Sequence, residues 1–319
     1  MKRNYLLVLV LCISSFRVWA QSGTLDATLL EMADRYYMPT VRAALGTFTF
    51  ETSGLPTPFA RWLEDRLVLA ASASKRMELL NRNAAAAMDP AFRKQYEEFF
   101  AGAGTGALLH GAYFVEGQDV RVRLELTDLG SATLIDARDW TVRIASLPAY
   151  ATVRPTIDAA ARARELSSLA ASPAGGLVVS VSTERGAGAA YREGEELGIM
   201  LSVNKDAYVR LYHVDGAGRI QLIWPNRYGG GKGLMKAGSL VRIPSDGDPF
   251  AFKLQPPYGT EFLKAVASTV PFVDSQEDFS DLGGEARDVM TRGLSVVSTA
   301  STETLYAEAL ASYYIGPRE

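Results

Sequence analysis

The sequence predicts two structural parts in one chain. The first is an α/β sandwich, in which helices cover one face of a mixed sheet, and the second is an all-β sandwich with one or two peripheral helices. Three observations support this: helical and strand patterns alternate through the first half, short strands separated by Gly-, Asp- and Pro-containing turns fill the second, and a linker-like segment at 172–176 (Ser-Pro-Ala-Gly-Gly) lies between them. A chain of 319 residues is also longer than one hydrophobic core usually holds.

Residues 1–20 have the layout of a cleaved secretory signal. A basic start at 2–3 precedes an apolar run at 5–12, and residues 18–20 (Val-Trp-Ala) fit the small-residue rule of signal peptidase. The run is too short to span a bilayer, which needs about 20 apolar residues, and no later segment approaches that length. We therefore expect an exported chain, periplasmic or associated with the outer envelope. Its mature form has no predicted transmembrane segment, and peripheral membrane association stays open.

Removal of this signal changes both the cysteine content and the charge. The only cysteine, Cys12, leaves with it, and Leu11 directly before that cysteine argues against a lipoprotein anchor. The 33 basic residues fall to 30 against 36 acidic ones, so the net charge goes from −3 to −6. The mature chain therefore offers no thiolate chemistry, and it lacks the basic footprint of a nucleic-acid-binding protein.

The α/β part is expected over residues 21–147. Its clearest strand is 120–127, where apolar and polar residues alternate without a fault, as in a half-buried antiparallel strand. Gly117 and Gln118 before it predict a hairpin with the preceding strand. The expected elements are helices at 25–36, about 58–70 and 89–100, and strands at 41–50, 76–80, 108–115, 120–127 and from 131 to about 144.

Three motifs in this part support a family resemblance over roughly residues 25–146. They are 43–48 (Ala-Ala-Leu-Gly-Thr-Phe), 77–82 (Met-Glu-Leu-Leu-Asn-Arg) and 106–113 (Gly-Ala-Leu-Leu-His-Gly-Ala-Tyr). Their succession is similar to envelope proteins around the curli-secretion channel, a group that includes a penicillin-binding-protein activator lipoprotein and a flagellar outer-membrane protein. The resemblance implies assembly or regulation of an envelope apparatus. Pore formation is not implied, because this chain lacks the lipobox and the long insertions of the channel protein.

Residues 148–176 are predicted to form a helical linker. Thr156 can cap a helix that runs to about Ala171, and the helix is rich in Ala and Arg with little apolar bulk. We expect a spacer more than a core element.

The all-β part is expected over residues 177–319. Residues 207–214 and 219–224 should form a hairpin across the turn at 215–218 (Asp-Gly-Ala-Gly). The last strand, 306–315, alternates weakly and is expected at a sheet edge. Further strands are expected at 177–182, 197–203, 239–243 and 262–268, and a helix at 281–292.

Two strand-and-turn segments give this part its own resemblance. Residues 219–228 end in Trp-Pro-Asn-Arg-Tyr, and 256–261 read Pro-Pro-Tyr-Gly-Thr-Glu; each joins a strand to a turn made rigid by proline. With the turns at 215–218 and 236–239, they closely resemble a bacterial family known as domain of unknown function 4384. The resemblance identifies a module and implies no activity.

No catalytic or cofactor pattern is found, so the sequence predicts a non-enzymatic protein without a cofactor or metal. The glycine-rich run at 229–233 lacks the Gly-Lys-Ser/Thr ending of a phosphate-binding loop. The acidic segment at 274–281 has Phe279 where a calcium loop needs glycine. His110 and His213 lie in different parts and are expected to be structural.

The aromatic residues at strand ends of the second part are the best candidates for binding. A flat ring in such a place can face a partner, although packing under the proline turns is the more ordinary role. We predict an envelope binding or assembly module that acts through its β-sandwich and takes envelope proteins as partners; the alternative is a protein that binds or processes cell-wall glycan. The candidate contact residues are Trp224, Asn226, Arg227, Tyr228, Pro257 and Tyr258.

Overall fold

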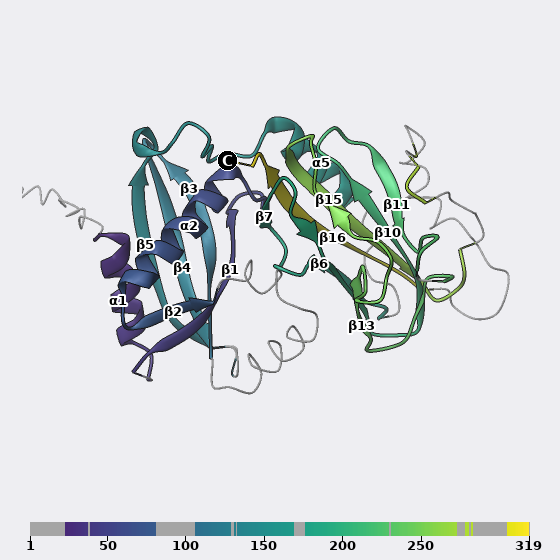
Figure 1. Ribbon diagram of the computed structural model, residues 1–319, viewed down its shortest axis with the longest axis horizontal. Helices are drawn as coiled ribbons and strands as arrows, with labels where there is room; N and C mark the ends of the chain where they lie inside the picture. The colour runs from purple at the N-terminus through teal and green to yellow at the C-terminus, as the bar shows by residue number, and fades with distance from the viewer. Residues whose placement is uncertain are drawn as a thin grey trace, which may run out of the picture.

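The structure is a computed structural model in which an α/β unit and a β-sandwich lie side by side (Figure 1). It describes residues 23–37, 39–80, 106–128, 131, 133–168, 176–229, 231–272, 278–280, 282 and 305–318. The predicted signal peptide and the predicted helix at 89–100 lie outside these residues, as does the predicted helix at 281–292 apart from Leu282. In the described part of the chain, no helix is both long and apolar enough to cross a membrane.

The N-terminal part is built on one mixed sheet of five strands, in the order β2-β1-β3-β4-β5. Strand β1 pairs in parallel with β2 and β3, whereas β3-β4 and β4-β5 are antiparallel, as the predicted hairpin requires. The elements are α1 (Leu25–Asp34), β1 (Val41–Phe50), α2 (Pro58–Ala73), β2 (Met77–Leu80), β3 (Ala107–Glu116), β4 (Asp119–Asp128), β5 (Leu134–Arg143) and a 3₁₀ turn (Ile144–Ser146).

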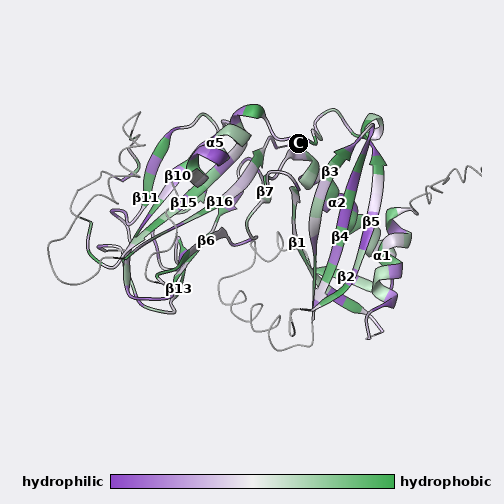
Figure 2. Cartoon of the chain, turned by 180° about the vertical axis from the view of Figure 1, so that it is seen from behind, coloured by the Kyte–Doolittle hydropathy of each residue, from purple (hydrophilic) through white to green (hydrophobic). Residues whose placement is uncertain are grey.

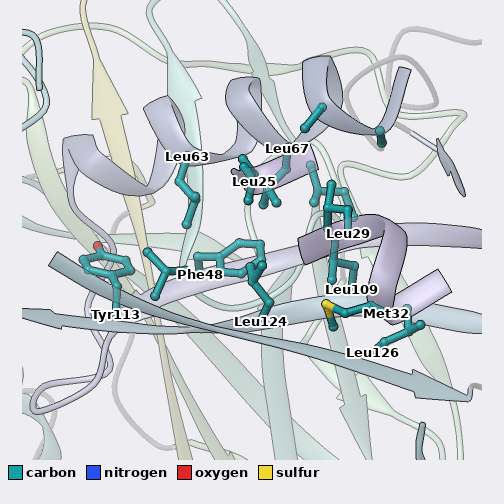
Figure 3. Close-up of a cluster of buried hydrophobic side chains, with 14 of the residues drawn as sticks. Leu25, Leu29, Met32, Phe48, Leu63, Leu67, Leu109, Tyr113, Leu124 and Leu126 are labelled. Carbon is teal, nitrogen blue, oxygen red and sulfur yellow. The ribbon is translucent and has the colours of Figure 1, made fainter. Parts of the chain in front are cut away.

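Helices α1 and α2 cover one face of this sheet and enclose an apolar core (Figure 3). On β4 the predicted alternation is confirmed, because Val120, Val122, Leu124 and Leu126 are all fully buried. The hydropathy colours alternate along the strands of the sheet (Figure 2). The helices supply the facing apolar residues, which include Leu29, Met32, Phe59, Leu63 and Leu67.

The C-terminal part is a β-sandwich, as predicted. Its large sheet has the order β11-β10-β15-β16-β7 with β12 beside β10, and it faces a three-stranded sheet β13-β9-β6; β8 and β14 form a separate pair. The strands are β6 (Val179–Thr183), β7 (Ala189–Arg192), β8 (Glu196–Leu197), β9 (Ile199–Val203), β10 (Ala207–Val214), β11 (Ile220–Trp224), β12 (Leu234–Met235), β13 (Leu240–Ile243), β14 (Phe252–Lys253), β15 (Gly259–Ser268) and β16 (Tyr306–Gly316).

Strand β16 corrects the prediction of an edge strand. It pairs antiparallel with β15 along ten residues and in parallel with β7, so it lies inside the large sheet. Its apolar alternation is weak because both of its faces are covered, and a strand buried on both sides does not alternate cleanly. The hairpin of β10 and β11, in contrast, is confirmed.

The helix predicted as a spacer is also corrected. Helix α5 (Ile157–Ser168) packs on the outer face of the large sheet, where Ala159 and Leu166 are buried against Tyr212, Phe262 and Val266. Small alanine side chains let the helix approach the sheet closely, which explains how a segment with little apolar bulk becomes part of a core.

The two parts meet where α2 and β1 approach the turn before β7. Arg192 Nη2 lies 3.3 Å from Asp65 Oδ2, and Thr260 Oγ1 donates to the Pro56 carbonyl at 3.4 Å. Gly188, with φ of +80°, has no room for a side chain, because a Cβ there would meet Thr49 Cγ2 at 2.4 Å. The contact is therefore close and partly polar.

Glu64 lies at this junction with its side chain only 12% exposed. Burial raises the pKa of its carboxyl to about 8, although the nearby Arg61 and Arg185 work in the opposite direction. Arg61 Nη1 is 3.6 Å from Glu64 Oε2. The junction therefore holds a carboxyl that takes up a proton near neutral pH.

Candidate functional site

The structure places Trp224 in the core and so corrects its prediction as a contact residue. The residue is only 7% exposed and packs among the apolar residues between the two sheets. A large indole at the end of a strand is more stable packed than in water, and here the sandwich interior is deep enough to take it.

Asn226 shapes the turn that follows. Its side-chain Oδ1 accepts the backbone N–H groups of Tyr228 at 2.9 Å and Gly229 at 3.0 Å, and its Nδ2 donates to the Ile223 carbonyl at 2.8 Å. An asparagine that bonds to nearby backbone in this way stabilises a turn. Its role is to hold the following residues in place.

Arg227 and Tyr228 stand on this turn and are accessible. The Arg227 guanidinium forms a fork with the Asp278 carboxylate, with Nη2 to Oδ1 at 2.8 Å, and this lowers the pKa of Asp278 through the hydrogen bonds it donates. Tyr228 is 50% exposed.

Four aromatic residues meet at this end of the sandwich, and we call them the aromatic surface: Tyr228, Phe250, Phe252 and Phe279. Their ring centroids form a closed cycle, with Tyr228–Phe250 and Phe250–Phe252 at 5.3 Å, Phe252–Phe279 at 6.4 Å and Tyr228–Phe279 at 6.2 Å. These tilted and edge-on contacts are the geometries that aromatic pairs prefer. All four rings are at least partly exposed.

Pro257 and Tyr258 are adjacent in the chain but have different surroundings. Pro257 lines a cleft beside the aromatic surface. Tyr258 does not line it; the ring is 43% exposed, and its hydroxyl donates to Glu193 Oε2 at 2.7 Å, which raises the pKa of the phenol. Of the six predicted residues, Arg227 and Tyr228 therefore lie together, Pro257 lies across the cleft, and Tyr258 lies apart.

The cleft has a volume of about 270 Å³ and opens between the large sheet and the β8-β14 pair. Apolar residues make most of its walls, and two aromatic rings of the aromatic surface, Phe252 and Phe279, belong to it. Its apolar lining is completed by Leu197, Ile223, Ala251, Leu254, Pro256, Pro257 and Ile315, and its polar lining includes His213, Asp215, Arg219, Gln221, Lys253, Glu261 and Tyr313.

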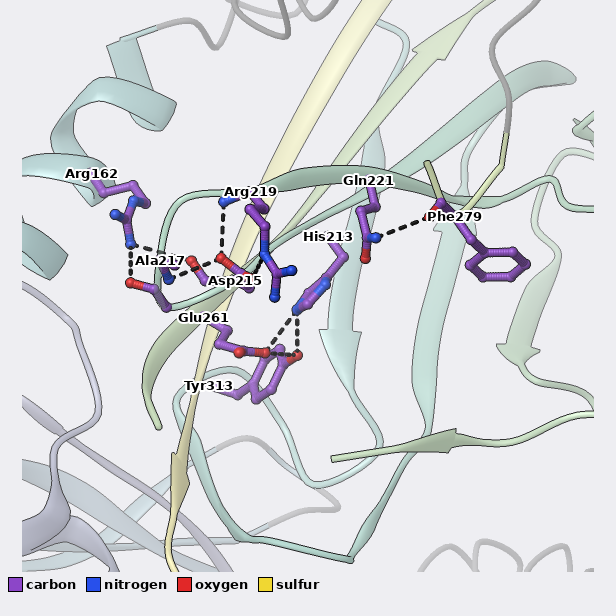
Figure 4. A network of polar contacts seen from close by, with 10 residues as sticks. Arg162, His213, Asp215, Ala217, Arg219, Gln221, Glu261, Phe279 and Tyr313 are labelled. Carbon is purple, nitrogen blue, oxygen red and sulfur yellow. Dashed lines mark hydrogen bonds and ion pairs between the residues drawn. The ribbon is translucent and has the colours of Figure 1, made fainter. Parts of the chain in front are cut away.

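Three polar side chains from neighbouring strands form a connected network in the lining of the cleft (Figure 4). His213 Nε2 lies 2.8 Å from Glu261 Oε2, and the Tyr313 hydroxyl donates to the same oxygen at 2.7 Å and lies 3.1 Å from His213 Nε2. Glu261 and Tyr313 are almost completely buried, whereas the His213 side chain is 20% exposed. Burial, reinforced by the Glu261 carboxylate, raises the pKa of Tyr313 well above its usual range, so the phenol stays a hydrogen-bond donor.

A second polar pair lies at the end of the β10-β11 hairpin. Asp215 Oδ1 accepts the backbone N–H groups of Ala217 and Arg219, both at 2.9 Å, and Oδ2 accepts Arg219 Nε at 2.6 Å. Burial works to raise the pKa of Asp215, but these hydrogen bonds outweigh it and the pKa is lowered. From α5, Arg162 Nη1 donates to the carbonyls of Asp215 and Gly216, so the helix also fixes this turn.

Phe279, which lines the cleft, has an unusual backbone conformation. Its φ of +60° is in the left-handed region, which is costly for a bulky residue. The conformation is held by hydrogen bonds to β11: Phe279 N–H donates to the Leu222 carbonyl at 2.9 Å, and Gln221 Nε2 donates to the Phe279 carbonyl at 3.0 Å. The strained backbone places an aromatic ring against the cleft.

Sequence reasoning missed the polar network. His213, Glu261 and Tyr313 are far apart in the chain, and only the pairing of β10, β15 and β16 brings them together. His110 is by comparison unremarkable, since its Nε2 meets Thr127 Oγ1 at 3.0 Å on the N-terminal sheet. Within the described residues, no group of three or more His, Cys, Asp or Glu side chains is arranged to hold a metal ion.

Residues 190–271 match the family described as domain of unknown function (DUF4384). The match confirms the resemblance predicted for the C-terminal part over those residues. It spans the strands from β8 to β15 and thus includes His213 and Glu261, but it ends before Phe279 and Tyr313. No curated protein matches the chain.

Two solved structures are similar to part of the chain. One is the LpoB C-terminal domain from Escherichia coli, at 12% identity over 37% of this chain and 94% of that chain, with a TM-score of 0.28. The other is the LpoB C-terminal domain from Salmonella enterica, at 14% identity over 37% of this chain and 93% of that chain, with a TM-score of 0.26. At these TM-scores the likeness supports no conclusion about function, and the resemblance of residues 25–146 to the curli-channel and activator group stays a prediction.

Proposed function

We propose that this chain is an exported, non-enzymatic binding module of the cell envelope, and that it contacts a protein partner through the aromatic surface. The observation that carries the proposal is the closed cycle of four partly exposed rings, Tyr228, Phe250, Phe252 and Phe279, beside an open cleft. Aromatic residues are enriched at protein interfaces because they bury a large area at a small cost in side-chain entropy.

The way in which the surface is held also supports a binding role. Asn226 fixes the turn, and the fork between Arg227 and Asp278 ties that turn to the segment that carries Phe279. A surface that is already in its bound shape loses less entropy when a partner docks. The rings are therefore preorganised for binding.

Export is supported by the sequence of residues 1–20. The envelope location is part of the proposal. A protein partner is inferred from the aromatic composition of the surface, since aromatic residues are enriched at protein interfaces.

The test is site-specific photo-crosslinking in intact cells. A benzophenone amino acid at position 228 should give a crosslinked adduct of defined mass, and mass spectrometry should identify an envelope protein in it. The matched control is the same replacement at Tyr37, which is 78% exposed on the N-terminal part. Equal adducts from both positions, or none from position 228, would contradict the proposal.

The alternative partner is cell-wall glycan, which the protein would bind or process. The observation that favours it is that Tyr228 and Tyr258 present half-exposed rings near polar groups. Sedimentation with purified peptidoglycan tests it, because retention that falls in Tyr228→Ala or Tyr258→Ala, and not in Tyr37→Ala, would establish glycan binding. Retention unchanged in all three variants would reject a glycan site at these rings.

A further inference from the structure

We propose that the cleft binds a positively charged nitrogen group, an amine or guanidinium on an apolar stem, and that Glu261 is its acceptor. The inference deepens the proposed function and rests on it only in assigning ligand recognition to the same end of the sandwich.

Glu261 is a buried carboxylate with one oxygen left over. Its side chain is only 3% exposed, and His213 and Tyr313 both bind the same atom, Oε2. Among the described residues, both hydrogen bonds of this carboxylate go to Oε2, and Oε1 is not among the completely buried polar atoms that lack a partner, so Oε1 is accessible. A buried carboxylate is costly unless a cation or further donors accompany it, and Glu261 lines the cleft, so the missing donor can come from a ligand there.

One positively charged side chain of the lining already has its own acid. Arg219 donates through Nε to Asp215 Oδ2 at 2.6 Å, four residues before it in the same turn. Asp215 also accepts two backbone N–H groups, so the Asp215 carboxylate has donors of its own. Within the described residues, no hydrogen bond joins this pair to Glu261, whose two donors are His213 and Tyr313.

The second positively charged residue of the lining, Lys253, starts on the face of β14 opposite to Phe252. Phe252 pairs across the β8-β14 ladder with the buried Leu197, whereas Lys253 pairs with the exposed Glu196. Successive side chains on a strand point to opposite faces. Since Phe252 and Leu197 face the interior, the Lys253 side chain leaves β14 on the opposite face, and within the described residues no hydrogen bond joins it to Glu261.

The walls suit a cation with an apolar stem. Phe252 and Phe279 both line the cleft, and their ring centroids lie 6.4 Å apart with an interplanar angle of 63°. Aromatic faces attract ammonium and guanidinium groups within about 6 Å. The cleft volume of about 270 Å³ leaves room for one long side chain or a small amine.

The test compares charged and neutral probes of equal shape by isothermal titration calorimetry with the mature chain. Phenethylamine is set against phenethyl alcohol, and the peptide acetyl-Gly-Lys-Gly-amide against its norleucine counterpart. Each charged probe should bind at least about tenfold more tightly than its neutral partner, because a charge-assisted hydrogen bond to a buried carboxylate is lost in the neutral one. Tighter binding of the lysine peptide than of phenethylamine would identify a partner protein as the source, and the reverse order a free amine.

Two variants locate the site. Glu261→Gln keeps the shape of the side chain and should weaken the charged probes about tenfold or more. Glu196→Gln, the same change on the outer face of β8, should leave them unaffected. Because Glu261→Gln also alters a buried network, Ala251→Trp provides a second block: Ala251 is exposed and lines the cleft, so a large ring there should prevent binding without touching the core.

Equal binding of charged and neutral probes would overturn the proposal, as would unchanged binding in Glu261→Gln or no binding of either charged probe by the folded protein. These results are separable from the proposed function. Crosslinking from position 228 that persists in Glu261→Gln would leave the partner surface standing even if the amine site were rejected.

Discussion

The two parts of the chain differ in what they bury. The N-terminal core is apolar and, apart from Glu64 at the junction, its buried polar side chains in the described residues are neutral ones such as Thr28 and Thr57. The C-terminal part buries charge, and the set comprises Arg185, Arg210, Asp215, Glu261 and Lys264. Burying a charge is costly, so a protein keeps one where it contributes specificity or function. The contrast directs attention to the C-terminal part as the functional one.

The largest expected change in the free energy of unfolding comes from breaking the buried ion pair under α5. Lys264 Nζ is 2.6 Å from Glu308 Oε2, both side chains are 1% exposed, and the ammonium also donates to the Leu166 carbonyl. Lys264→Met should lower the free energy of unfolding by about 3–5 kcal/mol, because it leaves a buried carboxylate without a partner. Urea unfolding measures this.

The comparison is sharpened by two controls. The double variant Lys264→Met with Glu308→Leu should recover most of the loss, since an apolar pair can replace a buried ion pair. Arg42→Met, which breaks the exposed pair with Glu78 on the N-terminal sheet, should cost less than about 1 kcal/mol. A similar cost for Lys264→Met and Arg42→Met would remove the distinction between the two parts.

The second prediction separates core from surface within one turn. Trp224→Ala should cost about 3–5 kcal/mol of unfolding free energy, because a buried indole is replaced by a cavity. Tyr228→Ala should cost less than about 1 kcal/mol but abolish partner capture. If instead Trp224→Ala unfolds at the same urea concentration as the unmodified protein, the placement of the indole in the core is wrong.

The third prediction concerns pH at the junction between the parts. The pKa of Glu64 is raised to about 8, so between the usual carboxyl pKa and pH 8 the folded chain holds a proton that the unfolded chain releases. Stability therefore falls as pH rises through this window. Glu64→Gln removes the dependence and should stabilise the chain by about 1–3 kcal/mol at pH 9, with little effect at pH 4.

The measurement is the thermal unfolding midpoint from pH 4 to pH 9. Glu31→Gln, at a carboxylate whose side chain is 63% exposed on α1, is the matched control and should show no such trend. If Glu64→Gln raised the unfolding midpoint by the same amount at every pH from 4 to 9, the Glu64 carboxyl would not titrate in this window.

The smallest effect is expected at the fork between Arg227 and Asp278. Arg227→Gln should cost about 0.5–1 kcal/mol, because the arginine side chain is 54% exposed and such pairs contribute little to stability. Partner capture from position 228 should fall more than this, since the fork orders the aromatic surface. Full capture in Arg227→Gln would mean that the surface needs no such preorganisation.

Local patterns predicted much of the fold. The faultless alternation of 120–127 gave the clearest strand, and the turn at 215–218 gave the β10-β11 hairpin. The errors came where tertiary packing decides: the sequence predicts an edge strand for β16, which lies inside the large sheet, and a spacer for α5, whose alanine-rich sequence gives little sign that it packs on that sheet. In both cases the partner surface is distant in sequence.

The site was less predictable than the fold for the same reason. The turn with Arg227 and Tyr228 was found from local proline and aromatic signals. The cleft depends on strand register, since Glu261 faces Tyr313 only through the pairing of β15 with β16. Phe279 was noticed only as a residue that breaks a calcium pattern, and its contact with Tyr228 could not be inferred from spacing.

The most direct test of a partner surface at the sandwich end is the crosslinking yield in intact cells from position 228, measured with and without Phe250→Ala. The account predicts a specific adduct that is lost when Phe250, which supports the Tyr228 ring at 5.3 Å, is removed. The N-terminal control at position 37 should give no such adduct in either background. An adduct from position 228 that survives Phe250→Ala, or that appears equally from position 37, would contradict the central claim.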